Sequence, residues 1–314
     1  MKKKPMEPSK KILLPVDGSQ RCLETVKYVA HYAPFHSMKA VLFNVFSDVP
    51  ECYWDLEREP KSVKAALHVR AWVSQKKKEM EEHMEKARQI LLRGGFEPDA
   101  VSVQIHSRKK GVARDILKEA QRRYTAVVLR RRGATGLRNI TLGSVATKLM
   151  ERLTCCPLII VGRKPMSRRV LIGVDGSEGA GHAVDFVAKT LDGLDFSAHL
   201  VNVIRGTCTE VAGEEGEPAA PVHPLKAEEE IIPVLEDAKA RLLEAGFTSD
   251  RVTWRVITGV KSRAAAIAEE AEKEDCETIV VGRRGLSGVR QFFIGRVSNK
   301  VVFLARKNTV WVVT

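Results

Sequence analysis

Short apolar runs alternate with helix-length segments along the whole chain. The runs cover residues 11–16, 40–46, 100–106, 125–130 and 157–162 in the first half, and 169–174, 198–204, 251–257, 277–282 and 309–313 in the second. Continuous apolar runs with helices between them are typical of parallel strands that are buried on both faces. The pattern therefore predicts an α/β protein with five such strands in each half.

Helix signals occur at matched places in the two halves. The long segments 61–93 and 225–245 are predicted to form the second helix of each half. Residues that start or end helices fit this assignment: Ser19 and Ser177 as N-caps of the first helices, and Gly94-Gly95 and Gly246 after the second. The least regular stretches, 47–60 and 205–224, are predicted to be surface loops or lids.

The chain contains an internal repeat. KILLPVDGSQRCLETVKYVA at 11–30 matches RVLIGVDGSEGAGHAVDFVA at 169–188, and residues 126–150 match residues 278–302. A repeat of this length indicates two copies of one domain. We place the domains at residues 1–163 and 164–314.

Two motifs in each copy fall where a doubly wound sheet binds its ligands. Asp17 and Asp175 directly follow strand one of their copies, and a glycine-rich stretch follows strand four. Ligands of such sheets bind at the carboxyl ends of the strands, beside the point where the strand order reverses. We therefore expect the Asp and the glycine-rich stretch of each copy to meet in one crevice.

These motifs resemble the universal stress protein family in its tandem, two-domain form. The resemblance rests on the strand-one Asp and on G-x-x-G-x(9)-G-[ST] after strand four, and it covers nearly the whole chain. It implies an adenine nucleotide α-hydrolase-like fold with strand order 3-2-1-4-5. The implied ligand is ATP or another adenine nucleotide, with or without Mg²⁺. The Asp would meet ribose or adenine, a residue after strand two would touch adenine, and the glycine loop would hold the phosphates.

The resemblance assigns candidate binding residues in both copies. They are Asp17, Val45, Gly133, Gly143 and Ser144 in the first copy, and Asp175, Val203, Gly282, Gly285, Gly295 and Arg296 in the second. Arg130 replaces the first glycine of the first copy, where it could fill the ribose site, and Arg296 replaces the Ser of the second. Because a missing glycine blocks the approach of backbone amides to an anion, we expect the second copy to be the competent site.

Plainer roles remain open for the same residues. Each Asp can be a turn or N-cap carboxylate, and each Val can be an ordinary core residue. The arginines at 130–132 and 283–284 form either a solvated rim or a collar that attracts anions.

Charge and composition limit which partners the protein is expected to bind and where in the cell it is expected to act. The first copy holds 32 Lys and Arg against 17 Asp and Glu, and the second holds 20 against 22. Aromatic residues make up 6% of the chain and do not interleave with the basic runs, so no stacking platform for single-stranded nucleic acid is expected. Binding of nucleic acid or an anionic surface through the basic first copy stays a third possibility, behind the two functions given below. With no membrane-length apolar run, no CxxC pair and no metal-ligand spacing of histidines, we expect a cytoplasmic protein without a metal site.

No catalytic motif occurs, so we expect a nucleotide-binding module of the stress response, with slow ATP hydrolysis at most. The alternative is a structural stress protein with degenerate sites that binds an unknown protein partner. The apolar runs LIIV at 158–161 and VWVV at 310–313 are predicted edge strands, and an apolar edge strand is normally paired with another strand or covered. We expect them to pair the two domains within one chain, with homodimerisation as a further option.

Overall fold

The computed structural model describes residues 10–47, 63–132, 142–163, 166–205, 224–285 and 294–314, with the backbone alone for helical residues 63–70 and 224–226. Contacts divide the chain into two compact units, Met1–Cys156 (unit 1) and Pro157–Thr314 (unit 2).

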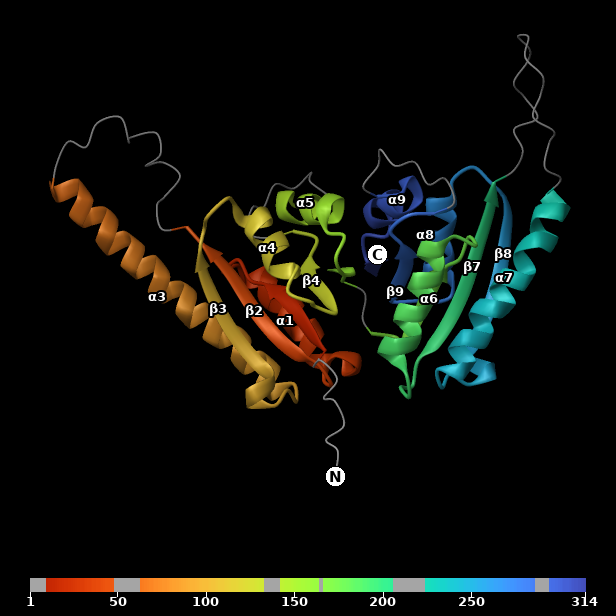
Figure 1. Ribbon diagram of the computed structural model, residues 1–314, viewed down its shortest axis with the longest axis horizontal. Helices are drawn as coiled ribbons and strands as arrows, with labels where there is room; N and C mark the ends of the chain where they lie inside the picture. The colour runs from red at the N-terminus through yellow and green to blue at the C-terminus, as the bar shows by residue number, and fades with distance from the viewer. Residues whose placement is uncertain (1–9, 48–62, 133–141, 164–165, 206–223, 286–293) are drawn as a thin grey trace, which may run out of the picture. The chain divides into compact units, whose positions relative to one another are not determined.

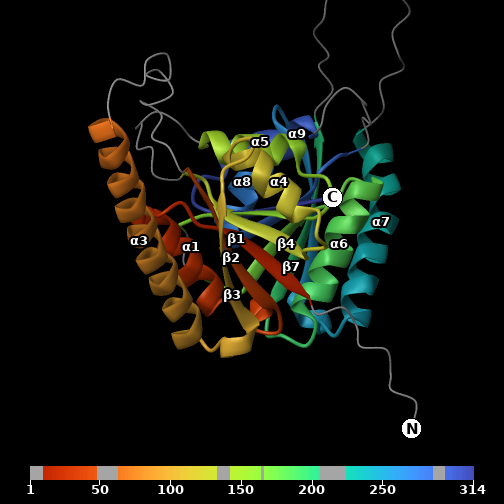
Figure 2. The same cartoon turned by 60° about the vertical axis from the view of Figure 1, so that its left-hand side comes forward.

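Unit 1 is a parallel sheet with helices on both faces (Figure 2). Its described elements are β1 (Lys11–Pro15), α1 (Gln20–His31), β2 (Lys39–Phe46), α3 (Val63–Arg93), β3 (Val101–Ser107), α4 (Val112–Ala120), β4 (Ala126–Arg130) and α5 (Ser144–Arg152). The strands lie in the order β3-β2-β1-β4 and run parallel. Helix α1 packs with α3, and α4 packs with α5.

Unit 2 repeats this plan and adds two strands, β5 and β10 (Figure 1). Its described elements are β5 (Leu158–Val161), β6 (Arg169–Gly173), α6 (Glu178–Leu191), β7 (Ser197–Arg205), α7 (Pro224–Glu244), β8 (Val252–Val260), α8 (Arg263–Lys273), β9 (Thr278–Gly282), α9 (Arg296–Leu304) and β10 (Thr309–Val313). The strand order is β5-β10-β9-β6-β7-β8. All neighbours are parallel except β5, which runs antiparallel to β10 with Ile160 opposite Val310.

The predicted fold class is confirmed. The chain is α/β with a mostly parallel sheet, and unit 2 shows the order 3-2-1-4-5 as β8-β7-β6-β9-β10. The central strands are buried along their length because helices cover both faces: every residue of β9 and β10 is buried. Trp311 of β10 is fully buried and meets Phe186 of α6 edge to face, with ring centroids 5.5 Å apart.

The predicted caps are also confirmed. The Ser19 hydroxyl accepts a hydrogen bond from Cys22 N, and the Ser177 hydroxyl accepts one from Ala180 N, each at 3.2 Å. Gly95 and Gly246 end α3 and α7 with φ of +96° and +91°, a conformation that disfavours any side chain. The predicted loops at 47–60 and 205–224 lie almost wholly outside the described residues.

The last strand of the first repeat belongs to unit 2. The repeat places the boundary after residue 163, whereas the two units meet between Cys156 and Pro157. Strand β5 pairs with β10, and Arg163 N donates to Lys307 O at 2.6 Å. Gly162 lies so close to the backbone of Lys307 and Asn308 that a Cβ there would collide with it. Among the described helices, none is long and apolar enough to cross a membrane.

Candidate functional site

Asp175 lies in a tight turn between β6 and α6. Its Oδ1 accepts hydrogen bonds from the backbone N (3.1 Å) and the hydroxyl (2.5 Å) of Ser177, which in turn caps α6. Gly176, with φ of +75°, allows the chain to reverse between them. Oδ1 therefore stabilises the turn, which is the role of a turn carboxylate considered above. The other oxygen, Oδ2, faces the loop that follows β9.

The loop after β9 approaches Asp175 at glycine positions. A Cβ on Gly285 would collide with Asp175 Oδ2, and a Cβ on Gly282 would collide with the backbone of Gly179 in the first turn of α6. Gly179 has no room either, because its Cβ would strike Arg284 O. The Asp and the first two glycines of the motif therefore meet at the carboxyl edge of the sheet.

Gly295 starts α9 without a side-chain cap. Its N donates to Arg283 O at 2.8 Å, which fixes the loop's return to the helix. Arg296 follows on the exposed side, and Ser298 in the same turn is buried, with its hydroxyl donating to Gly282 O at 2.6 Å. The first turn of α9 therefore presents backbone N–H groups and one cation at the end of the motif, an arrangement that suits an anion.

Sequence reasoning missed a buried amide beside the site. Asn202 of β7 is 7% exposed and donates from Nδ2 to Val174 O at 2.7 Å, directly before Asp175. Asn44 of β2 makes the same bond to Val16 O, also at 2.7 Å. The sequence did contain a sign of this role: Asn44 and Asn202 directly precede Val45 and Val203 in the matched segments LFNV and LVNV. Val203 is buried and Val45 is half-buried, as expected of core strand residues.

The crevice of unit 1 has the same turn and different neighbours. Asp17 Oδ1 accepts hydrogen bonds from the backbone N (3.0 Å) and the hydroxyl (2.6 Å) of Ser19. Arg130, which replaces the first motif glycine, forms an ion pair of 2.5 Å with Glu24 of α1. Arg21 occupies the position of Gly179. With side chains at both positions, unit 1 cannot make the glycine contact of unit 2.

The rest of the first copy's motif is described only in part. Gly133 lies outside the described residues. Gly143 starts α5, with its N donating to Arg131 O at 2.6 Å, and Ser144 is exposed at the first helical position. This end of the loop therefore matches that of unit 2.

The arginine runs at 130–132 and 283–284 are neither wholly solvated nor wholly available to attract an anion. Arg131 and Arg283 are 8% and 5% exposed, whereas Arg284 is exposed. Burial, and after it the charge of Arg284, lowers the pKa of Arg283 to about 10. The buried members therefore belong to the fold, and Arg284 and Arg296 are the cations that a ligand of unit 2 could reach.

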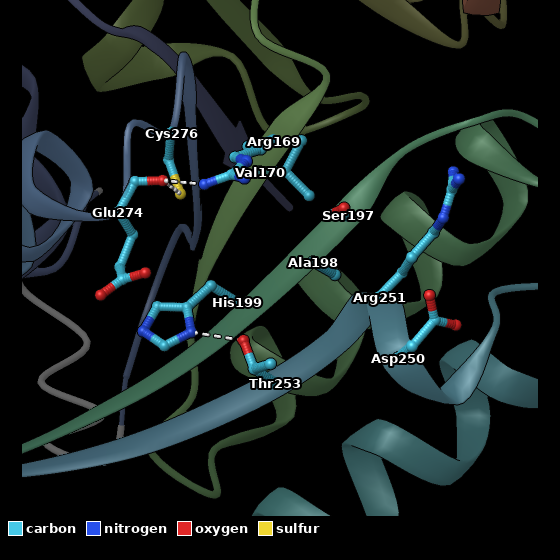
Figure 3. A pocket seen from close by; sticks show the side chains of 10 residues that line it. All are labelled: Arg169, Val170, Ser197, Ala198, His199, Asp250, Arg251, Thr253, Glu274 and Cys276. Atoms are coloured by element: carbon cyan, nitrogen blue, oxygen red, sulfur yellow. Dashed lines mark hydrogen bonds between the residues drawn. The ribbon is translucent and has the colours of Figure 1, made fainter.

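Unit 2 has a cavity at the amino ends of its strands, away from the Asp175 turn (Figure 3). It measures about 170 Å³, and residues at the amino ends of β6, β7 and β8 line it. In it His199 Nδ1 and Thr253 Oγ1 lie 2.8 Å apart. It is smaller than the roughly 300 Å³ of small-molecule pockets, so it is not a candidate for a nucleotide. In the part of the chain that is described, no group of three or more His, Cys, Asp and Glu could hold a metal.

Comparisons with known proteins agree on one family. The model of the universal stress protein family matches residues 8–162 and again 166–314. Universal stress protein YxiE of Bacillus subtilis is 26% identical over 141 residues, which are 43% of this chain and 92% of that protein. A universal stress protein structure from Archaeoglobus fulgidus has a TM-score of 0.65 at 18% identity and covers 98% of both chains. A putative one from Pseudomonas aeruginosa has a TM-score of 0.52 at 16% identity, over 97% of this chain and 93% of the other.

Proposed function

Because the chain belongs to the universal stress protein family, in tandem form, we propose that it binds an adenine nucleotide, ATP in the first instance, through the crevice of unit 2. It acts in the cytoplasm as a binding or regulatory module of the stress response. The observation that carries this proposal is the glycine contact in unit 2, which brings the loop after β9 against the Asp175 turn.

Recognition divides among three parts of the crevice. Asp175 Oδ2 accepts hydrogen bonds from the sugar, while Oδ1 keeps the turn in place. The end of β7 at Val203 offers an apolar contact for the base. Loop amides, the first turn of α9 and Arg296 receive the phosphates, where partial and full positive charge favours an anion. Any Mg²⁺ arrives with the nucleotide.

We propose binding without a dedicated catalytic step. Cations beside a bound triphosphate polarise it, so slow hydrolysis is the upper limit of activity.

Unit 1 supports a different function for the first copy. The Arg130–Glu24 ion pair and Arg21 replace the glycine contact there. We propose that this copy serves assembly or a protein partner instead of the nucleotide. Since β5 comes from the first repeat and pairs with β10 of the second, we also propose that the two domains pair within one chain. Sedimentation of the chain as one compact particle would support this pairing, and an expanded particle would oppose it.

A direct titration tests the nucleotide proposal. Labelled ATP should bind the wild type, and Asp175→Ala should weaken binding by about 1–3 kcal/mol because a hydrogen-bond acceptor is lost. The matched variant Asp17→Ala should leave the affinity unchanged. The proposal fails if folded Asp175→Ala binds like the wild type, or if the wild type binds no adenine nucleotide.

A further inference from the structure

A thiol, an imidazole and a thioether gather beside the Asp17 turn of unit 1. Cys22 Sγ in the first turn of α1 lies 3.3 Å from His83 Nε2 on α3. Met80 precedes His83 by one turn on the same helix face. A Cβ built on Gly18 would lie 3.7 Å from Met80 Sδ, so the thioether lies against the Asp17–Ser19 turn. We call Cys22, His83 and Met80 the soft-ligand cluster.

Unit 2 shows that the fold does not need this cluster. Helices α3 and α7 end alike, with Phe96 N donating to Leu91 O and Phe247 N donating to Leu242 O, each at 3.1 Å. When the two helices are aligned at these ends, with Phe247 matched to Phe96, Val234 of α7 stands at the position of His83 of α3. In the same way Ile231 stands at the position of Met80, and the internal repeat places Ala180 at the position of Cys22. Val234 also lies near the glycine turn of unit 2, since a Cβ built on Gly176 would be 3.9 Å from its methyl carbons. Unit 2 therefore carries apolar residues at the sequence positions of Cys22, His83 and Met80.

The geometry of the pair fits one shared ion. With bonds of about 2.3 Å to sulfur and about 2.0 Å to nitrogen, as for zinc, ligand atoms 3.3 Å apart subtend roughly 100° at the metal. That angle suits three or four ligands. Structural zinc sites take four ligands from Cys, His, Asp and Glu, and the described residues hold no group of even three such side chains. Thiolate and thioether ligands together select Cu⁺.

We propose that the soft-ligand cluster of unit 1 binds a monovalent copper ion through Cys22 Sγ, His83 Nε2 and Met80 Sδ. The site is independent of nucleotide binding by unit 2. The ion replaces the thiol proton, which passes to solvent, and no electron is transferred. The negative charge of Asp17, which acts on both Cys22 and His83, favours a cation there.

The backbone of the first turn of α1 holds the Cys22 side chain in place. Its thiol donates to Ser19 O at 2.9 Å, on the same side as His83 of α3. Cys22 itself is 7% exposed, which excludes water from the sulfur once the ion is in place.

Competition with a chromophoric Cu⁺ chelator under anaerobic, reducing conditions tests the site. The wild type should take up one Cu⁺ that Cys22→Ala and His83→Val lose, with the affinity falling by at least about 100-fold, since even outer-shell changes cost about 10–100-fold. Met80→Ile should weaken binding less. All three variants carry the residues of unit 2, so their metal-free thermal midpoints should stay close to that of the wild type. X-ray absorption at the copper edge should show sulfur and nitrogen ligands, with the nitrogen lost in His83→Val.

Other thiols in the chain supply the controls. Cys155 is exposed and Cys276 is buried in unit 2, and Cys155→Ser and Cys276→Ala should keep the tight site. Equal Cu⁺ uptake by the wild type, Cys22→Ala and His83→Val would overturn the proposal. If the wild type bound Zn²⁺ instead of Cu⁺, and Cys22→Ala and His83→Val lost that binding, the assignment of the ion as copper would be wrong.

Discussion

Neither Gly179 nor Gly282 of unit 2 has room for a side chain, because a Cβ on Gly282 would meet the Gly179 backbone and a Cβ on Gly179 would meet Arg284 O. The obstacle in each case is backbone, which cannot rotate away as the end of a side chain can. Unit 1 carries Arg21 and Arg130 at the same two positions and holds Arg130 by an ion pair with Glu24. Two residues thus decide how closely the loop after strand four approaches the first helix.

Gly282→Ala should destabilise unit 2 by about 3 kcal/mol, the upper end of the range for overpacking, because the new methyl group meets the Gly179 backbone. Gly181→Ala is the matched control, in helix α6 two residues after Gly179. Its Cβ would lie 3.7 Å from Arg241 Nη1, an ordinary contact, so it should stabilise by about 0.5–1 kcal/mol. Urea unfolding measures both changes, and equal effects would contradict the glycine contact.

The sequence predicted residues of the site wherever a known motif contained them. Asp175, Gly282 and Gly285 belong to the motif, and the structure brings Gly285 against Asp175 and Gly282 against the first turn of α6. Gly179 is not part of the motif. It is needed because the backbone at the end of β9, about 100 residues further on, comes too close to leave room for a side chain. Cys22 and His83 were passed over for a similar reason, since their ligand spacing exists in space and not along the chain.

At the scale of the elements, the apolar runs located every described strand to within three residues at each end. Strands buried on both faces have an unbroken apolar sequence, and this made the prediction simple. The runs at 158–161 and 310–313 were expected to pair, but their direction could not be predicted. An apolar run does not show whether its neighbour is parallel or antiparallel, and β5 lies antiparallel to β10.

Trp311 tests the burial of β10. Trp311→Ala should destabilise unit 2 by about 3–5 kcal/mol because it leaves a cavity beside Phe186 and removes a fully buried ring. Trp72 of α3 is 41% exposed, and Trp72→Ala should stay within about 0.5 kcal/mol of the wild type. Calorimetry would detect the difference, and similar costs for the two changes would show that β10 is not buried as described.

His199 of β7 links the stability of unit 2 to pH. Burial is the main cause that lowers its pKa below the ordinary 6.5, against the opposing charges of Glu274 and Glu270. The unfolded chain therefore binds the proton more readily, and the free energy of unfolding falls as the pH drops below about 6.5. His199→Gln should flatten this slope between about pH 5 and pH 7. The exposed His182 of α6 is the control, and an unchanged slope in His199→Gln would remove His199 as its source.

At the scale of the whole molecule, the two copies should bind different numbers of nucleotides. The wild type should saturate at one nucleotide per chain. Because unit 1 lacks two glycines of the contact, Arg130→Gly alone should also bind one, and Arg21→Gly with Arg130→Gly should bind two. Adding Asp17→Ala should abolish the second event. Calorimetric titration gives these numbers, and a wild type with two sites, or a double variant with one, would refute the asymmetry.

The pairing of β5 with β10 has a consequence for synthesis on the ribosome. Residues 158–161 leave the ribosome about 150 residues before β10 is complete, which takes roughly 7–30 s at the usual rates of elongation. During that time the edge of β5 that will meet β10 is open, although Leu158, Ile159 and Ile160 are fully buried in the finished protein. An open apolar edge recruits other strands. The nascent chain, and any chain that stalls before residue 309, is therefore the form that aggregates first and that a ribosome-associated chaperone would have to protect.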